Sequence, residues 1–237
     1  MLYLLKLREF QSEFSVKDYE NPTDLILRIG YRLLQQLDPK YTYHCKAHTL
    51  AVMGFIDDLF KWNDALGAYD KKRIYVTGYQ YRALKIAAMF HDLGYLDSPV
   101  HNEGIGVAYA MAAMASLSET QGEFADTIKN DVANYILSTA RLKVPVDRRQ
   151  AIILDADMVH VGASDPDEFL KWNKRLRDEY EALGKVYTHK EWLYTQTAFL
   201  SKVKFRTAFA KEKGMDKNLK ANIRALKDFY NLKKAQK

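Results

Sequence analysis

Two places in the first half of this sequence combine histidine and aspartate in a way that could bind a metal ion or transfer protons. His44 and His48 are four positions apart, so on a helix they would share one face. His91 and Asp92 end a strongly apolar run, where burial of ionisable groups without partners is unfavourable. Each pair also has a plainer explanation, because such histidines usually form a surface pair and a His-Asp doublet can simply end a helix.

A third group, of carboxylates, interrupts a later apolar run. Asp155 and Asp157 come directly after residues 152–154, which are Ile-Ile-Leu. Because the two aspartates are two positions apart, they would face roughly opposite sides of a helix and could not serve one site equally. A helix cap or a boundary salt bridge is the alternative explanation for either one.

Imidazoles and carboxylates from these three places form a mixed nitrogen and oxygen donor set. Such a set suits one divalent ion (Mn²⁺, Fe²⁺, Co²⁺, Ni²⁺, Zn²⁺ or, less well, Mg²⁺) and excludes a thiolate site for a soft metal. Four protein ligands on an octahedral ion would leave two positions for water and substrate. Water on such an ion is a nucleophile near neutral pH, so the donor set predicts hydrolysis.

The order and surroundings of these residues resemble the H…HD…D signature of the HD-domain phosphohydrolase superfamily. The segments that carry the resemblance are 43–49 (YHCKAHT), 88–95 (AMFHDLGY) and 154–157 (LDAD). Three further segments resemble a predicted metal-dependent subgroup: 101–103 (HNE), 136–139 (ILST) and 177–180 (RDEY). The likeness covers about residues 42–180.

This resemblance implies a helical fold that holds one ion through four residues: His48, His91, Asp92 and Asp157. Asp157 is preferred to Asp155 because the family's last ligand usually follows a small residue. Asp155 would then orient a ligand imidazole. A single ion is favoured, since His101 is the one candidate here for the extra histidines of two-metal members.

We expect the following roles in phosphoester hydrolysis. Glu103 would position or deprotonate the attacking water, and Asp92 would act as both ligand and catalytic residue. His44 is placed like the general acid of the family's cyclic-nucleotide phosphodiesterase branch, although Cys45 stands where that branch has asparagine. The candidates for binding the phosphate are Lys143, Arg177 and Asn102, with Lys85 or Arg141 as alternative cations.

The expected function is therefore a metal-dependent phosphohydrolase for a small phosphorylated substrate, with nucleotides among the candidates and monoesters and diesters both open. The alternative is an HD module that binds a nucleotide or a signalling phosphate without hydrolysing it. A nucleic-acid contact is a third interpretation, because residues 202–237 contain 12 Lys and Arg against 3 Asp and Glu. We do not favour it, since these charges follow the outer face of an amphipathic helix. Homo-oligomer formation is left open.

Helical periodicity predicts the elements that must position these groups, and strand signals are almost absent. The expected helices are about 22–37, 45–62, 79–93, 104–117, 122–137, 147–160, 166–183, 190–210 and 216–232. The helix over 79–93 is apolar nearly all round, so we expect it deep in the core, with Gly94 as its C-cap. The predicted fold class is all-α.

The predicted organisation is one helical-bundle domain of the HD type over residues 21–237, with residues 1–20 as an N-terminal appendage. The metal site would lie within about 42–180, and basic helices would follow over 190–237. With 237 residues, 48% of them apolar, the chain can bury a sizeable core. The single cysteine, Cys45, excludes a disulfide framework and favours a reducing compartment. The apolar start is too short for a signal peptide or membrane span, so we expect a cytoplasmic protein.

Overall fold

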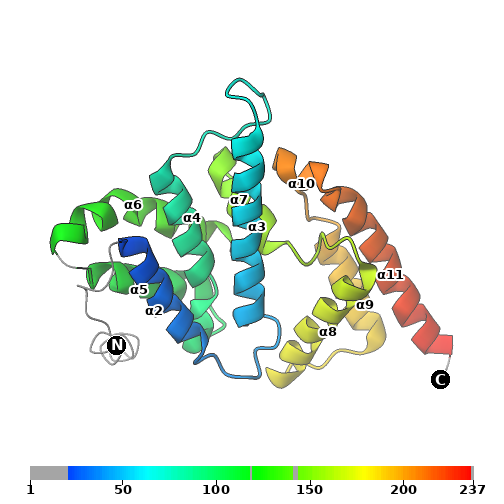
Figure 1. The fold of residues 1–237 in the computed structure, drawn as a ribbon. Coiled ribbons are helices and arrows are strands. Elements are labelled where there is room, and N and C mark those ends of the chain that lie inside the picture. The colour runs from blue at the N-terminus through cyan, green and yellow to red at the C-terminus, as the bar shows by residue number, and fades with distance from the viewer. Residues whose placement is uncertain (1–20, 118, 141–143, 236–237) are drawn as a thin grey trace.

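The computed structural model describes residues 21–117, 119–140 and 144–235, and these fold as an all-helical protein (Figure 1). Within those ranges the chain forms α-helices and one 3-10 helix, and no strand. The helices are α2 (Pro22–Leu34), α3 (Lys46–Ala65), α4 (Gly78–Phe90), η2 (Leu93–Leu96), α5 (Asn102–Ala115), α6 (Glu119–Ser138), α7 (Arg148–Asp157), α8 (Pro166–Ala182), α9 (His189–Leu200), α10 (Ala208–Glu212) and α11 (Met215–Ala235). The predicted all-α class is confirmed. The predicted appendage, residues 1–20, lies outside the described residues.

Helix α3 runs between two groups of helices (Figure 1). In the first group α4 packs against α2, α5 and α6, and in the second α11 packs against α8 and α9. Helix α3 contacts α4 of the first group, and it also contacts α10, which packs against α11 of the second group. It therefore links both groups, and it packs against α7 as well. No helix in the described ranges combines the length and the apolar character that a bilayer span requires.

Helix α4 lies in the core, as its sequence predicts. Thr77 and Gln80 form a capping box at its start, which satisfies two backbone N–H groups. Every side chain from Ala83 to Phe90 is buried. His91 comes directly after this buried stretch, so the helix delivers an imidazole to the interior of the protein.

Gly94 is not the C-cap of α4, contrary to the expectation from sequence. The helix ends at Phe90, and the chain continues into η2, which contains Gly94. A Cβ atom on Gly94 would collide with the backbone carbonyl group of Asn102. The glycine is needed because two backbone segments touch here. This contact holds the start of α5 against the segment that carries His91.

The single helix predicted over residues 190–210 is wrong, because α9 ends at Leu200 and α10 begins at Ala208. Asp155, on α7, accepts hydrogen bonds from the backbone N–H groups of Arg206 (3.0 Å) and Thr207 (2.7 Å). It also accepts one from the Thr207 hydroxyl (2.8 Å). A buried carboxylate from a distant helix thus supplies acceptors where the chain leaves helical geometry, and local periodicity could not show this.

Replacing Asp155 with alanine should lower the free energy of unfolding by roughly 3 kcal/mol, because the buried N–H groups of Arg206 and Thr207 would lose their acceptor. Burial raises the pKa of this carboxyl to about 6, although the hydrogen bonds from Thr207 and Arg206 lower it. Urea denaturation should therefore be followed above that pH, where the group is ionised. The matched control is Asp58→Ala, which removes an exposed carboxylate that pairs with Lys61 one helical turn away. Equal losses of unfolding free energy in the two variants would contradict the role of Asp155 as the acceptor for these backbone N–H groups.

Candidate metal centre

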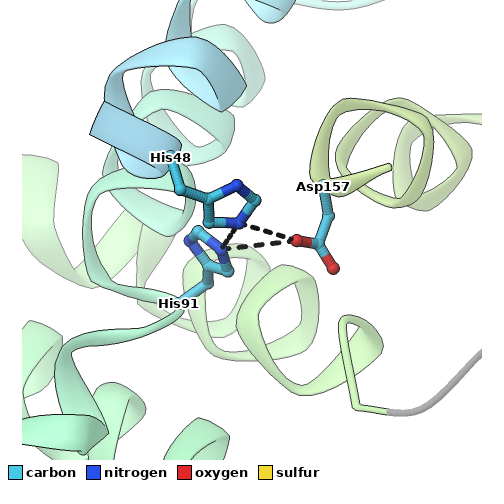
Figure 2. A group of neighbouring side chains, drawn as sticks. All are labelled: His48, His91 and Asp157. Atoms are coloured by element: carbon cyan, nitrogen blue, oxygen red, sulfur yellow. Dashed lines mark hydrogen bonds and ion pairs between the residues drawn. The ribbon is translucent and has the colours of Figure 1, made fainter. Parts of the chain in front are cut away.

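Three side chains from separate helices meet at one point in the interior (Figure 2). His48 lies in the first turn of α3, His91 directly follows α4, and Asp157 is the last residue of α7. His48 is 43 positions from His91 and 109 from Asp157 along the chain. Both imidazoles are fully buried. The meeting of these residues is therefore a product of the tertiary fold.

The nitrogen and oxygen atoms of these three residues are close enough to share one ion. The Nε2 atoms of His48 and His91 are 3.4 Å apart. Asp157 Oδ1 lies 3.2 Å from His48 Nε2 and 3.6 Å from His91 Nε2. These three residues form a group that is able to hold a metal ion.

Asp92 brings a fourth group to the same point. Its Oδ2 atom lies 3.0 Å from His91 Nε2 and 3.5 Å from His48 Nε2. This oxygen is buried and has no hydrogen-bond donor among the described residues. The structure thus brings together all four residues that the resemblance implies as ligands: His48, His91, Asp92 and Asp157.

A backbone hydrogen bond orients the His91 ring toward the cluster. His91 Nδ1 lies 2.8 Å from the carbonyl oxygen of Ala88, so Nδ1 carries the proton and donates it. The neutral ring then directs the lone pair of Nε2 at the other ligands, as metal-binding histidines require. Asp155 does not orient either imidazole, contrary to expectation, because both of its oxygens accept hydrogen bonds from residues 206–207.

The electrostatics of the cluster demand positive charge. Burial lowers the pKa of His91, but the Asp92 and Asp157 carboxylates outweigh burial and raise that pKa well above its usual value. Burial conversely raises the pKa of Asp157, yet the hydrogen bonds with His48 and His91 bring it below its usual value. Buried acceptors that converge in this way are stabilised by a proton or by a cation, and the nitrogen and oxygen set fits a divalent metal.

The cluster borders a pocket with a volume of about 370 Å³. His91, Asp92 and Asp157 form part of its wall, so an ion held there would be accessible to a small molecule. The remaining lining residues are Tyr43, His44, Tyr95, Pro99, Asn102, Glu103, Thr139, Met158, Leu176, Glu179, Tyr180, Leu183, Lys185, Thr195, Gln196 and Phe199. The C-terminal helices α8 and α9 thus supply one wall of the pocket, and the metal cluster supplies another.

His44 lies in this pocket and is held by Glu179. Its Nδ1 atom is 2.5 Å from Glu179 Oε1. Glu179 Oε2 accepts hydrogen bonds from the backbone N–H groups of Tyr43 (2.9 Å) and His44 (3.0 Å). The Tyr95 ring stacks on the imidazole, with centroids 4.3 Å apart. Burial lowers the pKa of His44, but the Asp92 and Glu179 carboxylates raise it above its usual value.

Glu179 was not assigned a role from the sequence, although a signal for it was present. Phe169 and Trp172 are buried at helical spacing on α8, and Glu179 continues the same stripe with only 1% exposure. A glutamate on a buried stripe requires a partner. Its partner here is the segment that precedes α3.

Glu103 and Asn102 open helix α5, and both line the pocket. With its amide turned to donate, Asn102 places its nitrogen 3.0 Å from Glu103 Oε2, so it steadies this carboxylate. His101 is exposed and does not line the pocket. It therefore adds no ligand to the cluster.

The structure does not place Arg177 in the pocket. Its guanidinium pairs with Glu181 (3.1 Å) and donates to the backbone carbonyl of Tyr187 (2.6 Å). Lys85, an alternative, is bound to Asp57 at 2.6 Å.

Two of the expected phosphate-binding cations, Lys143 and Arg141, lie outside the described residues. Lys185, which sequence reasoning missed, is the one lysine or arginine that lines the pocket among the described residues. Its ammonium group lies 5.2 Å from the centre of the Tyr180 ring. A loop lysine of this kind has no local signal, because its place depends on where α8 ends.

Comparison with known proteins finds no matching family model, no matching curated protein and no matching solved structure.

His91→Asn should lower the affinity for Mn²⁺ or Zn²⁺ by about 100-fold or more, because it removes a ligand whose ring is already oriented. The matched control is His101→Asn, which alters an exposed histidine with a left-handed φ of 58° that asparagine tolerates. Isothermal titration calorimetry on the dialysed protein measures both. Equal affinities in the two variants would show that the metal, if bound, is held elsewhere.

Metal affinity should also fall as the pH is lowered. The raised pKa of His91 means that the metal-free protein holds a proton there at neutral pH, and a cation must displace it. Binding should therefore release a proton, and the apparent affinity should rise as the pH approaches the raised pKa from below. Calorimetric titration of the protein with metal, repeated in buffers with different ionisation enthalpies, gives the number of protons released per ion bound. A count of zero near neutral pH would contradict this electrostatic description.

Proposed function

We propose that this protein is a metal-dependent hydrolase of phosphoesters, of the HD-domain type that its motifs resemble. The observation that carries the proposal is the position of the cluster. His48, His91, Asp92 and Asp157 converge in the interior, and the last three of them also line a pocket large enough for a small substrate. A cluster that served only stability would need no such access.

A divalent cation bound at this cluster would supply Lewis acidity and a positive charge against the charge that develops on a phosphoryl group. The cluster residues would hold it through two nitrogens and two carboxylates. Because both imidazoles are buried, their positions are set before a substrate arrives.

His44 is suited to protonate the oxygen of the leaving group. Glu179 fixes the ring by accepting from Nδ1, which leaves Nε2 as the atom that can give a proton to a substrate. Tyr95 keeps the ring plane in place and has its hydroxyl 3.3 Å from Nε2. Glu179 and Tyr95 are positioning residues in this scheme.

Glu103 is suited to accept a proton from the attacking water. Its carboxylate lies in the same pocket and is steadied by Asn102. Lys185 lies in the segment that connects α8 with α9 and lines the pocket, so it can place positive charge near the phosphate.

A screen of phosphomonoesters and phosphodiesters with the Mn²⁺-loaded protein tests the proposal. Asp92→Ala and His91→Ala should abolish hydrolysis of both ester classes, while His101→Asn, which tolerates the left-handed φ of 58°, should leave it unchanged. Turnover that persists in both cluster variants would contradict the proposal. Binding of metal and phosphoester with no turnover across the screen would instead support the non-catalytic binding module.

His44→Ala should lower kcat by about 10²–10⁴-fold with metal binding retained, because it removes the general acid. The loss should be much smaller for an ester with a good leaving group, such as 4-nitrophenyl phosphate, which does not need protonation. Comparison with phenyl phosphate measures this difference. Equal losses on the two esters would contradict the role assigned to His44.

A further inference from the structure

A buried chain of three polar side chains connects the interior of the C-terminal helices with the pocket. Asn173 lies on α8, and Trp192 and Gln196 lie on α9. Their exposed fractions are 6%, 0% and 6%. Among the three, only Gln196 lines the pocket that also contains the metal cluster.

The hydrogen bonds in this chain run in one direction. The Trp192 indole N–H donates to Asn173 Oδ1 at 2.9 Å. The Asn173 amide nitrogen in turn donates to Gln196 Oε1 at 2.9 Å. An indole N–H can only donate, so it fixes which end of the Asn173 amide is the acceptor. Asn173 then fixes the amide of Gln196 by the same logic.

Because these hydrogen bonds run from Trp192 through Asn173 to Gln196, the NH₂ group of Gln196 is the end of the series that has no acceptor among them. None of the hydrogen bonds found among the described residues uses that nitrogen. The side chain is more than nine-tenths buried and borders the pocket, so its two N–H groups can reach an acceptor only within that pocket and have none among the described residues. A ligand with an acceptor oxygen would satisfy them.

The surroundings indicate which part of a ligand this oxygen belongs to. Leu176 and Phe199 line the pocket beside Gln196, and both also border the small apolar cavity next to it. A phosphoryl group would lose hydration there without a cation, whereas the organic part of a substrate would be buried favourably. The acceptor is therefore expected on the organic group.

We infer that Gln196 is a specificity-determining residue that donates a hydrogen bond to a carbonyl-type oxygen on the organic part of the substrate, with Asn173 and Trp192 as the positioning residues that set its polarity. This inference rests on the proposed function in taking the pocket as the substrate site. The substrate class it names is a phosphoester whose organic group carries a ring carbonyl, such as a nucleotide with a keto base. Bases with an amino group in the same place would be disfavoured, because donor would face donor.

Two pairs of nucleosides provide the probes. Uridine and cytidine differ by a carbonyl against an amino group at one ring position, and inosine and adenosine differ in the same way. Because nucleosides contain no phosphoester, titration calorimetry with the full chain reads recognition separately from hydrolysis. The wild-type protein should bind uridine and inosine roughly tenfold or more tightly than their amino counterparts.

Asn173→Asp provides the sharpest variant, because a carboxylate can only accept. Trp192 would still donate to it, but Gln196 would have to turn its NH₂ group inward and present its carbonyl oxygen to the pocket. The preference should then invert in favour of cytidine and adenosine. If Asn173 had only a structural role, the variant would bind all four nucleosides more weakly by the same factor. Gln196→Met, which removes both polar atoms, should abolish the preference and provides a second test should the Asp variant fail to fold.

Asn63→Asp is the matched control. Asn63 is also a buried asparagine, and both ends of its amide are bonded to the backbone of Ile74, away from the pocket. This variant should retain the wild-type preference. The corresponding nucleoside monophosphates, assayed for phosphate release, should show the same order in kcat/KM.

The outcomes separate the two proposals. Nucleoside preference that inverts in Asn173→Asp, with no hydrolysis of any phosphomonoester or phosphodiester in the screen, would keep the recognition role and reject the hydrolase. Phosphate release with equal binding of keto and amino nucleosides, or with no binding of any of the four, would overturn the role of Gln196 and leave the hydrolase standing.

Discussion

The structure depends on one electrostatic constraint: three buried side chains and one partly buried carboxylate point their acceptor atoms at the same small volume. His48 and His91 contribute nitrogens 3.4 Å apart, and Asp92 and Asp157 each place an oxygen within 3.6 Å of both. Such an arrangement is unfavourable unless positive charge lies between the groups. Protons provide that charge in part, which is why the pKa of His91 rises. A divalent cation provides it in full, so the capacity for metal binding follows from the fold.

The fold creates this point by bringing helix ends together. Helix α4 is buried along its second half, so it delivers the residue that follows it to the interior, at the wall of the pocket. Gly94 then allows the start of α5 to touch the segment after His91, which brings Glu103 to the same pocket. Glu179, from α8, reaches the residues just before α3 and orders them. The C-terminal helices therefore belong to the site rather than forming an appendage to it.

Much of this could be predicted from the sequence because it depends on local patterns. Helical periodicity located most helices, and ionisable residues inside apolar runs marked the cluster before any contact was known. Three features could not be predicted, since each depends on long-range packing. Asp155 interrupts the helix expected over 190–210 through hydrogen bonds to residues 51 and 52 positions away. Arg177 was expected at the phosphate but is bound to Glu181 and the Tyr187 backbone. The direction of the amide chain that ends at Gln196 is visible only when its donors and acceptors are placed.

The most direct test of the metal centre is a crystal structure of the Mn²⁺- or Zn²⁺-soaked protein, with anomalous diffraction recorded at the absorption edge of the metal. One anomalous peak is expected, at about 2.0–2.3 Å from the Nε2 atoms of His48 and His91 and from carboxylate oxygens of Asp92 and Asp157. A fully loaded crystal with its peak elsewhere, or a clear map with no peak at this cluster, would contradict the central claim.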